Sequence, residues 1–98
     1  GYDLKGFSKE VTGYITGSTD VFSDAQIEST KEFTCGSYKT IENVVLVTEK
    51  TTEMKMAICH LSIETDSDYV QFIVMSTESN KDKVISYAEG IGATLTAL

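Results

Sequence analysis

The sequence predicts an α+β fold in which an antiparallel β-sheet of four to five strands carries a C-terminal amphipathic helix packed on one face. Two observations lead to this prediction. Segments 43–48, 54–63 and 69–76 are rich in apolar and β-branched residues and are joined by short polar connections, as in antiparallel hairpins. An apolar stripe at helical spacing follows them, and segregated strands followed by a helix are typical of this class.

The first predicted strand covers residues 11–15. Valine, tyrosine and isoleucine favour a strand there, although Gly13 interrupts the run and weakens it. Residues 17–20 follow as a polar loop, since Gly, Ser, Thr and Asp are typical turn residues. The sheet is therefore expected to begin close to the N-terminus.

Two structures compete for the next segment. Ser23 and Gln26 have the spacing of a capping box, which favours a short helix over 24–32. The apolar residues further on fall on alternate positions, which favours a strand over 30–36 instead. The pattern favours the strand and leaves segment 23–29 open.

The next three strands differ in how their apolar residues are distributed. Segment 43–48 is apolar on successive positions, so it is expected to be covered on both faces or to lie centrally in the sheet. Successive strand residues point to opposite faces. In 54–63, one face therefore carries Met54, Met56, Ile58 and His60, and the other carries Ala57, Cys59, Leu61 and Ile63. In 69–76, Val70, Phe72 and Val74 oppose Tyr69, Gln71, Ile73 and Met75.

The C-terminal helix is predicted over about 80–96. Its stripe consists of Val84, Ala88, Ile91, Leu95 and Leu98. Asp82 falls in the first turn, where the helix dipole favours a carboxylate. Gly90 and Gly92 are unusual inside a helix, because each costs about 1 kcal/mol relative to alanine. They indicate close packing of the helix on the sheet, or a helix that ends at Gly90.

Composition narrows the class of partner. The 98 residues include 15 acidic and 8 basic side chains, for a net charge of −7, and every basic residue is lysine. An acidic chain without arginine is a poor ligand for nucleic acid. The longest apolar run, 44–47, is far too short to insert into a membrane. We expect a single domain over 1–98; its start at Gly1 is compatible with a fragment of a longer protein, and no targeting segment indicates a compartment.

Two cysteines and the single histidine are the candidates for chemistry. A thiolate activated by an imidazole is a real nucleophile, but Cys59 and His60 are adjacent on a strand and point to opposite faces. A small thiol-dependent enzyme using Cys35 or Cys59 with His60 therefore remains an alternative. A second alternative is a secreted or envelope-anchored structural domain with a Cys35–Cys59 disulfide. The ligand spacing of a zinc site is missing, and neither a metal nor a cofactor is expected.

One acidic turn resembles the start of a calcium loop. Glu64, Asp66 and Asp68 alternate there, but Tyr69 stands where a sharp-turn glycine is needed and Met75 where a bidentate glutamate is needed. A solvated hairpin turn is the expected structure, with a weak surface cation site as its alternative.

The favoured function is a small non-enzymatic binding or interaction domain that acts through its sheet face or a sheet–helix cleft. Both faces of the predicted sheet are apolar, and one helix covers only one of them. The methionine-bearing face is then either capped by segment 23–29 or used to bind a protein partner or a second copy in a homodimer, and methionine suits an adaptable contact surface. Its candidate binding residues are Met54, Met56, His60, Tyr69 and Gln71.

Overall fold

The structure is a computed structural model that describes the backbone of residues 3–35 and 38–95 and the side chains of residues 3–34 and 38–91. Its elements in chain order are α1 (Leu4–Thr16), β1 (Phe22–Cys35), β2 (Tyr38–Glu49), β3 (Lys55–Glu64), β4 (Tyr69–Thr77), the 3-10 turn η1 (Glu78–Asn80) and α2 (Lys81–Leu95). The strands form one antiparallel sheet in the order β1-β2-β3-β4. The predicted α+β class is confirmed, including the C-terminal helix on one face.

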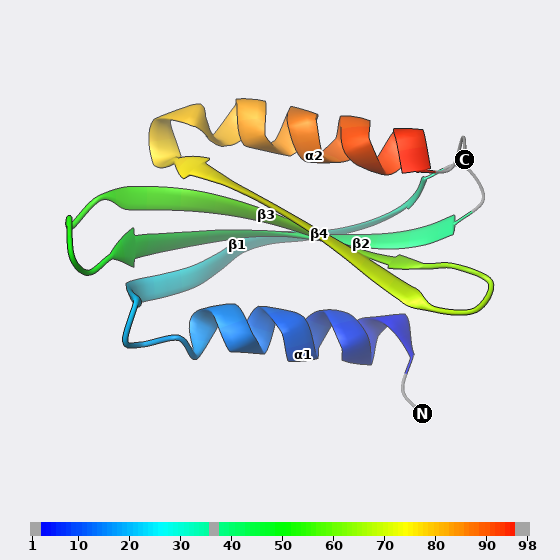
Figure 1. Cartoon of the computed structure of the whole chain (residues 1–98), viewed down its shortest axis with the longest axis horizontal. Coiled ribbons are helices and arrows are strands. Elements are labelled where there is room, and N and C mark those ends of the chain that lie inside the picture. Colours follow the sequence, from blue (N-terminus) through cyan, green and yellow to red (C-terminus); the bar gives the residue numbers. More distant parts are fainter. Residues whose placement is uncertain (1–2, 36–37, 96–98) are drawn as a thin grey trace.

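The molecule has three layers, because a second helix covers the other face of the sheet. In Figure 1 the sheet lies between α2 above and α1 below. Cross-strand partners share a face, so the register defines two sides. The α2 side carries Val44, Cys59 and Val74, and the α1 side carries Asn43 and His60. The sequence prediction placed no helix over residues 4–16, so it missed α1 as the second cover.

The strand expected over residues 11–15 is wrong, since these residues belong to α1. The helix begins after Asp3, whose side chain accepts the N–H of Gly6 at 2.9 Å. Its buried positions are Leu4, Ser8 and Thr12, so hydroxyl side chains occupy most of the stripe that faces the sheet. A search for apolar spacing cannot detect such a stripe.

The short helix considered over 24–32 does not form, so segment 23–29 is not the cap of the methionine-bearing face. Segment 23–29 lies within β1. The strand predicted over 30–36 is part of the same strand, which ends at Cys35. The pairing of β1 with β2 shifts twice, between Ser23 and Gln26 and again between Ile27 and Ser29. Asp24, between the two residues of the first shift, adopts a left-handed φ of 53°, a conformation that one type of β-bulge uses. These bulges break the simple alternation that identifies a strand.

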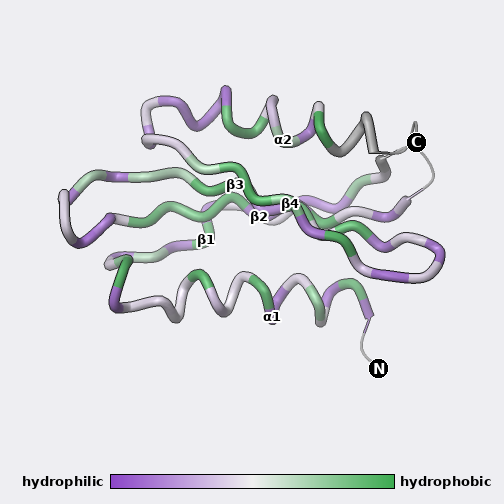
Figure 2. Tube along the Cα trace, viewed as in Figure 1, coloured by the Kyte–Doolittle hydropathy of each residue, from purple (hydrophilic) through white to green (hydrophobic). Residues whose placement is uncertain are grey.

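Two cores form because the central strands are buried on both faces, as segment 43–48 predicted. The core on the α2 side consists of Cys59, Leu61, Ile63, Val84 and Ala88. The smaller core on the α1 side consists of Val45, Val47 and Ile58. Figure 2 shows long hydrophobic stretches along β2 and β3, whereas α1 mixes hydrophobic and hydrophilic residues. The α1 layer is thus less apolar than the sheet it covers.

Helix α2 agrees closely with the prediction over 80–96. Val84 and Ala88 are buried and Ile91 is half-buried, while the side chains of Leu95 and Leu98 lie outside the described part of the chain. The helix continues through Gly90, so it does not end there. Gly90 does not mark close packing either, because a Cβ atom at this position would meet nothing within 4 Å.

The Gly90→Ala variant is therefore expected to be more stable than the parent by about 0.5–1 kcal/mol. The added methyl group meets open space, and alanine reduces the conformational freedom of the unfolded chain. Urea unfolding of the two proteins measures the difference. A loss of stability would show that the backbone of α2 at Gly90 is not helical.

Neither α1 nor α2 combines the length and the apolar character that crossing a lipid bilayer demands; this holds for residues 3–35 and 38–95.

Candidate functional site

The α1 side of the sheet brings together most of the residues that the sequence nominated for binding. Met56, His60, Gln71 and Tyr69 all belong to this side according to the register of β3 and β4. Met54 immediately precedes β3 and is 46% exposed. The alternation of the predicted strands therefore placed these side chains on the correct common face.

A row of polar side chains crosses this face, buried at Asn43 and His60 and exposed at its two ends, Thr30 and Gln71. Thr30 of β1 donates from Oγ1 to Oδ1 of Asn43 at 2.7 Å, and Nδ2 of Asn43 donates to Oγ of Ser8 on α1 at 2.6 Å. His60 is the register partner of Asn43 on β3, and its Nε2 lies 2.9 Å from Oε1 of Gln71 on β4. All four strands contribute to this row, and α1 is attached to it through a hydroxyl group.

His60 is fully buried and reaches the surface only through Gln71. Since the Gln71 oxygen can only accept, Nε2 of His60 carries the proton and Nδ1 accepts from the Ser62 hydroxyl at 3.4 Å. Burial lowers the pKa of His60, which keeps the imidazole neutral. The structure thus gives His60 the role of holding Gln71, while Gln71 itself is exposed.

Replacing Asn43 tests the hydrogen bond that holds α1 on the sheet. We expect Asn43→Val to lower the free energy of unfolding by about 2 kcal/mol, because the buried Ser8 hydroxyl loses its partner. The double variant Asn43→Val/Ser8→Ala is expected to recover part of this loss, since it replaces both partners by apolar groups. Urea unfolding of the double-mutant cycle measures the coupling, and strictly additive losses would contradict it.

Part of the α1 side remains uncovered on β4. Ile73 and Met75 are 53% and 50% exposed, and Gln71 beside them is also exposed. Helix α1 packs on β1, β2 and β3, and it meets β4 at Tyr69, whose ring stacks on Phe7 with centroids 4.9 Å apart. We call the surface formed by Gln71, Ile73 and Met75 the open strip.

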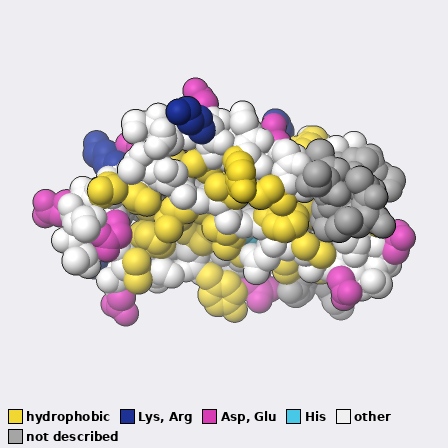
Figure 3. Space-filling view, turned by 45° about the horizontal axis from the view of Figure 1, so that its top comes forward, with side chains coloured by type: hydrophobic (Ala, Val, Ile, Leu, Met, Phe, Trp, Pro, Cys, Tyr) yellow, Lys and Arg dark blue, Asp and Glu magenta, His cyan; other side chains and the backbone are white. Residues whose placement is uncertain are grey.

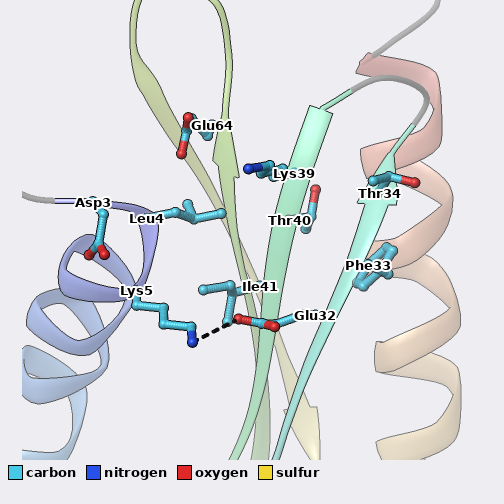
Figure 4. Close-up of a pocket in the computed structure, with 10 residues that line it drawn as sticks. All are labelled: Asp3, Leu4, Lys5, Glu32, Phe33, Thr34, Lys39, Thr40, Ile41 and Glu64. Carbon is cyan, nitrogen blue, oxygen red and sulfur yellow. Dashed lines mark ion pairs between the residues drawn. The ribbon is translucent and has the colours of Figure 1, made fainter.

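A cleft of about 500 Å³ opens between the first turn of α1 and the adjacent ends of β1 and β2. In Figure 4, Leu4 and Ile41 lie on its inner side and charged side chains surround them. Nζ of Lys5 lies 3.7 Å from Oε1 of Glu32, so an ion pair links α1 to β1 across the cleft. A second cleft of about 510 Å³ shares Lys5, Glu32 and Ile41 with the first. It extends along α1 and is also lined by Asn43 of β2. The small side chains at the base of α1 leave this space.

The α2 side holds a pair of carboxyl groups. Glu42 is only 4% exposed and is the register partner of Lys31, whose Nζ lies 3.0 Å from Oε2 of Glu89 on α2. Burial, together with the adjacent Glu89, raises the pKa of Glu42 to about 7. Among the described side chains, Oε2 of Glu42 meets no donor, so a proton on Glu42 that is donated to Glu89 satisfies the pair. This hydrogen bond from Glu42 lowers the pKa of Glu89.

Cys59 and His60 do not form a catalytic pair. Cys59 belongs to the core on the α2 side, whereas His60 faces the α1 side. Burial, reinforced by the nearby Glu42 and Glu89 carboxyls, raises the pKa of Cys59 to about 12, so it is a protonated thiol at neutral pH. Cys59 is also a free cysteine. Cys35 ends β1, where its register partner is Tyr38 of β2, and His60 lies two strands away on β3.

The acidic turn between β3 and β4 has the expected form. Asp66, Ser67 and Asp68 are exposed, and the Asp68 carbonyl accepts hydrogen bonds from the backbone N–H and the hydroxyl of Thr65. No group of three or more His, Cys, Asp or Glu side chains is arranged to hold a metal ion anywhere in the described part of the chain. The turn is a solvated hairpin end.

Sequence reasoning missed the polar residues that organise both sides. Ser8 and Thr12 follow Leu4 at intervals of four, which is a helical spacing, but only apolar residues were searched for it. Glu42 and Asn43 directly precede the apolar run 44–47. A strand expected to be covered on both faces makes polar residues at its end candidates for burial.

Comparison with protein-family models, with curated proteins and with solved structures finds no significant match to this chain. The geometry described above therefore carries the functional conclusion.

Proposed function

We propose that this protein is a small non-enzymatic binding domain that engages a protein partner through the α1 side of its sheet. One observation carries the proposal: α1 leaves the β4 part of this face uncovered, and Ile73 and Met75 are about half exposed there. The central strands β2 and β3, by contrast, are largely buried on both faces. Exposed apolar side chains that adjoin each other on a rigid sheet are typical of an interaction site.

The environments of the cysteine and the histidine that catalysis would need favour a binding function over an enzymatic one. The thiol of Cys59 is buried and protonated, and the imidazole of His60 uses both of its nitrogens within the protein. These two groups lie on opposite sides of the sheet. The thiol-dependent enzyme is therefore the weaker alternative.

The side chains of the open strip also indicate what kind of partner surface it would bind. Its three side chains are uncharged in a protein of net charge −7, so it favours an apolar partner surface over a basic one. Gln71 adds one polar group that His60 holds in place at 2.9 Å. The same negative charge disfavours nucleic acid.

The proposal is tested with Nile red, a neutral dye whose fluorescence rises in apolar surroundings. We expect it to bind the parent protein, and the Ile73→Thr/Met75→Thr double variant to bind about tenfold more weakly, because apolar contact area is lost. Threonine suits a strand, so the fold is kept. Val21→Thr serves as the matched control, since Val21 is 47% exposed but lies before β1.

Measurements are made on dilute protein whose melting temperature has been checked. Equal binding by the parent and the double variant would contradict the open strip as the binding surface. An Ile27→Thr variant then examines the second cleft, because Ile27 lines it. A loss of binding in this variant alone would move the binding site to the cleft on the same side.

A further inference from the structure

Strand β4 is an edge strand of the described sheet and lacks the features that usually block an edge. It has β3 as its sole strand neighbour among the residues that the structure describes, so the outer row of its backbone N–H and C=O groups faces away from the sheet. Its nine residues, Tyr69–Thr77, include neither a charged residue nor proline. Its pairing with β3 runs without a register shift. Such an edge is a template for another strand.

The opposite edge, β1, is protected in three ways that β4 lacks. Its register shifts twice, and Asp24 has a left-handed backbone. It carries four charged side chains, Asp24, Glu28, Lys31 and Glu32. Three of these form ion pairs with α1 or α2, namely Glu28 with Lys81, Lys31 with Glu89 and Glu32 with Lys5. Bulges and charges are the usual means by which proteins block an edge, so the protection is one-sided here.

Both faces of β4 offer apolar contacts beside this backbone edge. Ile73 and Met75 are exposed on the α1 side, and Val70, Phe72 and Val74 are half-buried on the α2 side. Figure 3 shows hydrophobic side chains gathered in a band across this region, with charged side chains mainly around its margin. A strand laid against β4 would therefore gain side-chain contacts on both faces as well as backbone hydrogen bonds.

The lack of charge on β4 allows a second copy of the chain to supply this strand. Two copies of a chain with a net charge of −7 repel each other, so they can associate closely only where the contact surface carries no charge. β4 is such a surface along its whole length. Antiparallel pairing of a strand with its own copy is also self-complementary, because each contact occurs twice around a two-fold axis.

We propose that β4 pairs antiparallel with β4 of a second copy of this chain, giving one continuous sheet of eight strands, four from each copy. The two-fold axis then stands perpendicular to the sheet, so both α1 helices lie on the same side. The two open strips meet between these helices and form one longer apolar surface. The inference rests on the proposed function, since it identifies the partner of the surface to which the open strip belongs.

A matched pair of lysine variants tests the pairing. Ile73 and Ile27 are 53% and 49% exposed and lie on the same side of the sheet, one on β4 and one on β1. Sedimentation equilibrium of the full chain up to millimolar concentration measures self-association. We expect the parent to dimerise, Ile73→Lys to raise the dimer Kd at least about tenfold, and Ile27→Lys to change it less than about threefold. A monomeric parent, or equal weakening by both variants, overturns the proposal.

Amide hydrogen exchange of the parent examines the pairing without relying on a variant that must fold. Alternate amides of β4 are expected to exchange more slowly at concentrations where the dimer predominates than in dilute protein. A dimer in which β4 exchanges at the monomer rate overturns the proposal, because another surface must then be used. The dye measurement is made on dilute monomer. A monomeric chain that still binds the dye at the open strip therefore refutes only the pairing, and a dimer whose dilute monomer binds none refutes only the surface under Proposed function.

Discussion

Replacing Leu61 with alanine is expected to lower the free energy of unfolding by about 3–4 kcal/mol. Leu61 is completely buried on β3, and it packs in the core that joins the sheet to Val84 and Ala88 of α2. Its register partner on the same face is Phe72 of β4, which also packs against this core. A rigid sheet flanked by a helix collapses poorly around a lost side chain, so a cavity adds to the lost transfer free energy.

Urea unfolding with a constant m-value measures this loss. Ile73→Ala is the matched control, since Ile73 lies on the neighbouring strand but is half exposed, and its change is expected to stay below about 1 kcal/mol. Small domains have a total stability of about 5–15 kcal/mol, so the Leu61 variant should lose a large part of it. A change below about 1 kcal/mol at Leu61 would show that α2 does not pack on this face.

The second large effect concerns pH and the Glu42–Glu89 pair. The pKa of Glu42 is raised from 4.5 to about 7 in the folded protein, so the folded state holds this proton more tightly than the unfolded state. The stabilisation is complete below pH 4.5 and is lost as pH rises towards 7 and beyond. The loss amounts to roughly 3 kcal/mol by pH 9. Glu89 acts in the opposite sense, because its pKa is lowered and its contribution is lost as pH falls below 4.5.

The Glu42→Gln variant isolates this contribution. Glutamine keeps a donor towards Glu89 but cannot ionise, so the parent and the variant are expected to have similar stability near pH 5. By pH 9 the variant should be the more stable protein by roughly 3 kcal/mol. Glu10→Gln, at an exposed position on α1, should follow the parent at all pH values. A constant difference between parent and Glu42→Gln from pH 5 to 9 would refute the pairing.

The sheet was predictable because its strands obey simple periodicities. Segment 54–63 differs from β3 by one residue at each end, and segment 69–76 differs from β4 by one residue at its C-terminal end. The unbroken apolar run 44–47 indicated a strand with two covered faces. Helix α1 was not predictable from apolar spacing, because Ser8 and Thr12 fill its contact stripe. Their hydrogen bonds replace the apolar burial that a hydrophobic pattern detects.

The sequence predicted which side of the sheet carries the candidate site, but it did not predict which of the side chains there are exposed to solvent. Alternation placed His60 and Gln71 on one side, and the structure joins them by a hydrogen bond. Which side chains reach solvent depends on where α1 lies, and its position was not predicted. His60 is therefore buried, whereas Ile73 and Met75, which were not nominated, are the exposed apolar residues.

The hydroxyl-lined base of α1 has a consequence for the order in which the protein opens. Val84 and Ala88 fix α2 to the larger core, but α1 buries only Leu4, Ser8 and Thr12. With Leu4 buried and Ile15 only partly buried against the smaller core, α1 gains less from solvent exclusion than α2, and water entering the adjoining clefts can replace its hydrogen bond from Asn43 to Ser8. Local opening should therefore release α1 first, as a unit of lower stability than the sheet and α2. The released state would expose Asn43, His60 and the whole α1 side of the sheet while the other core stays intact.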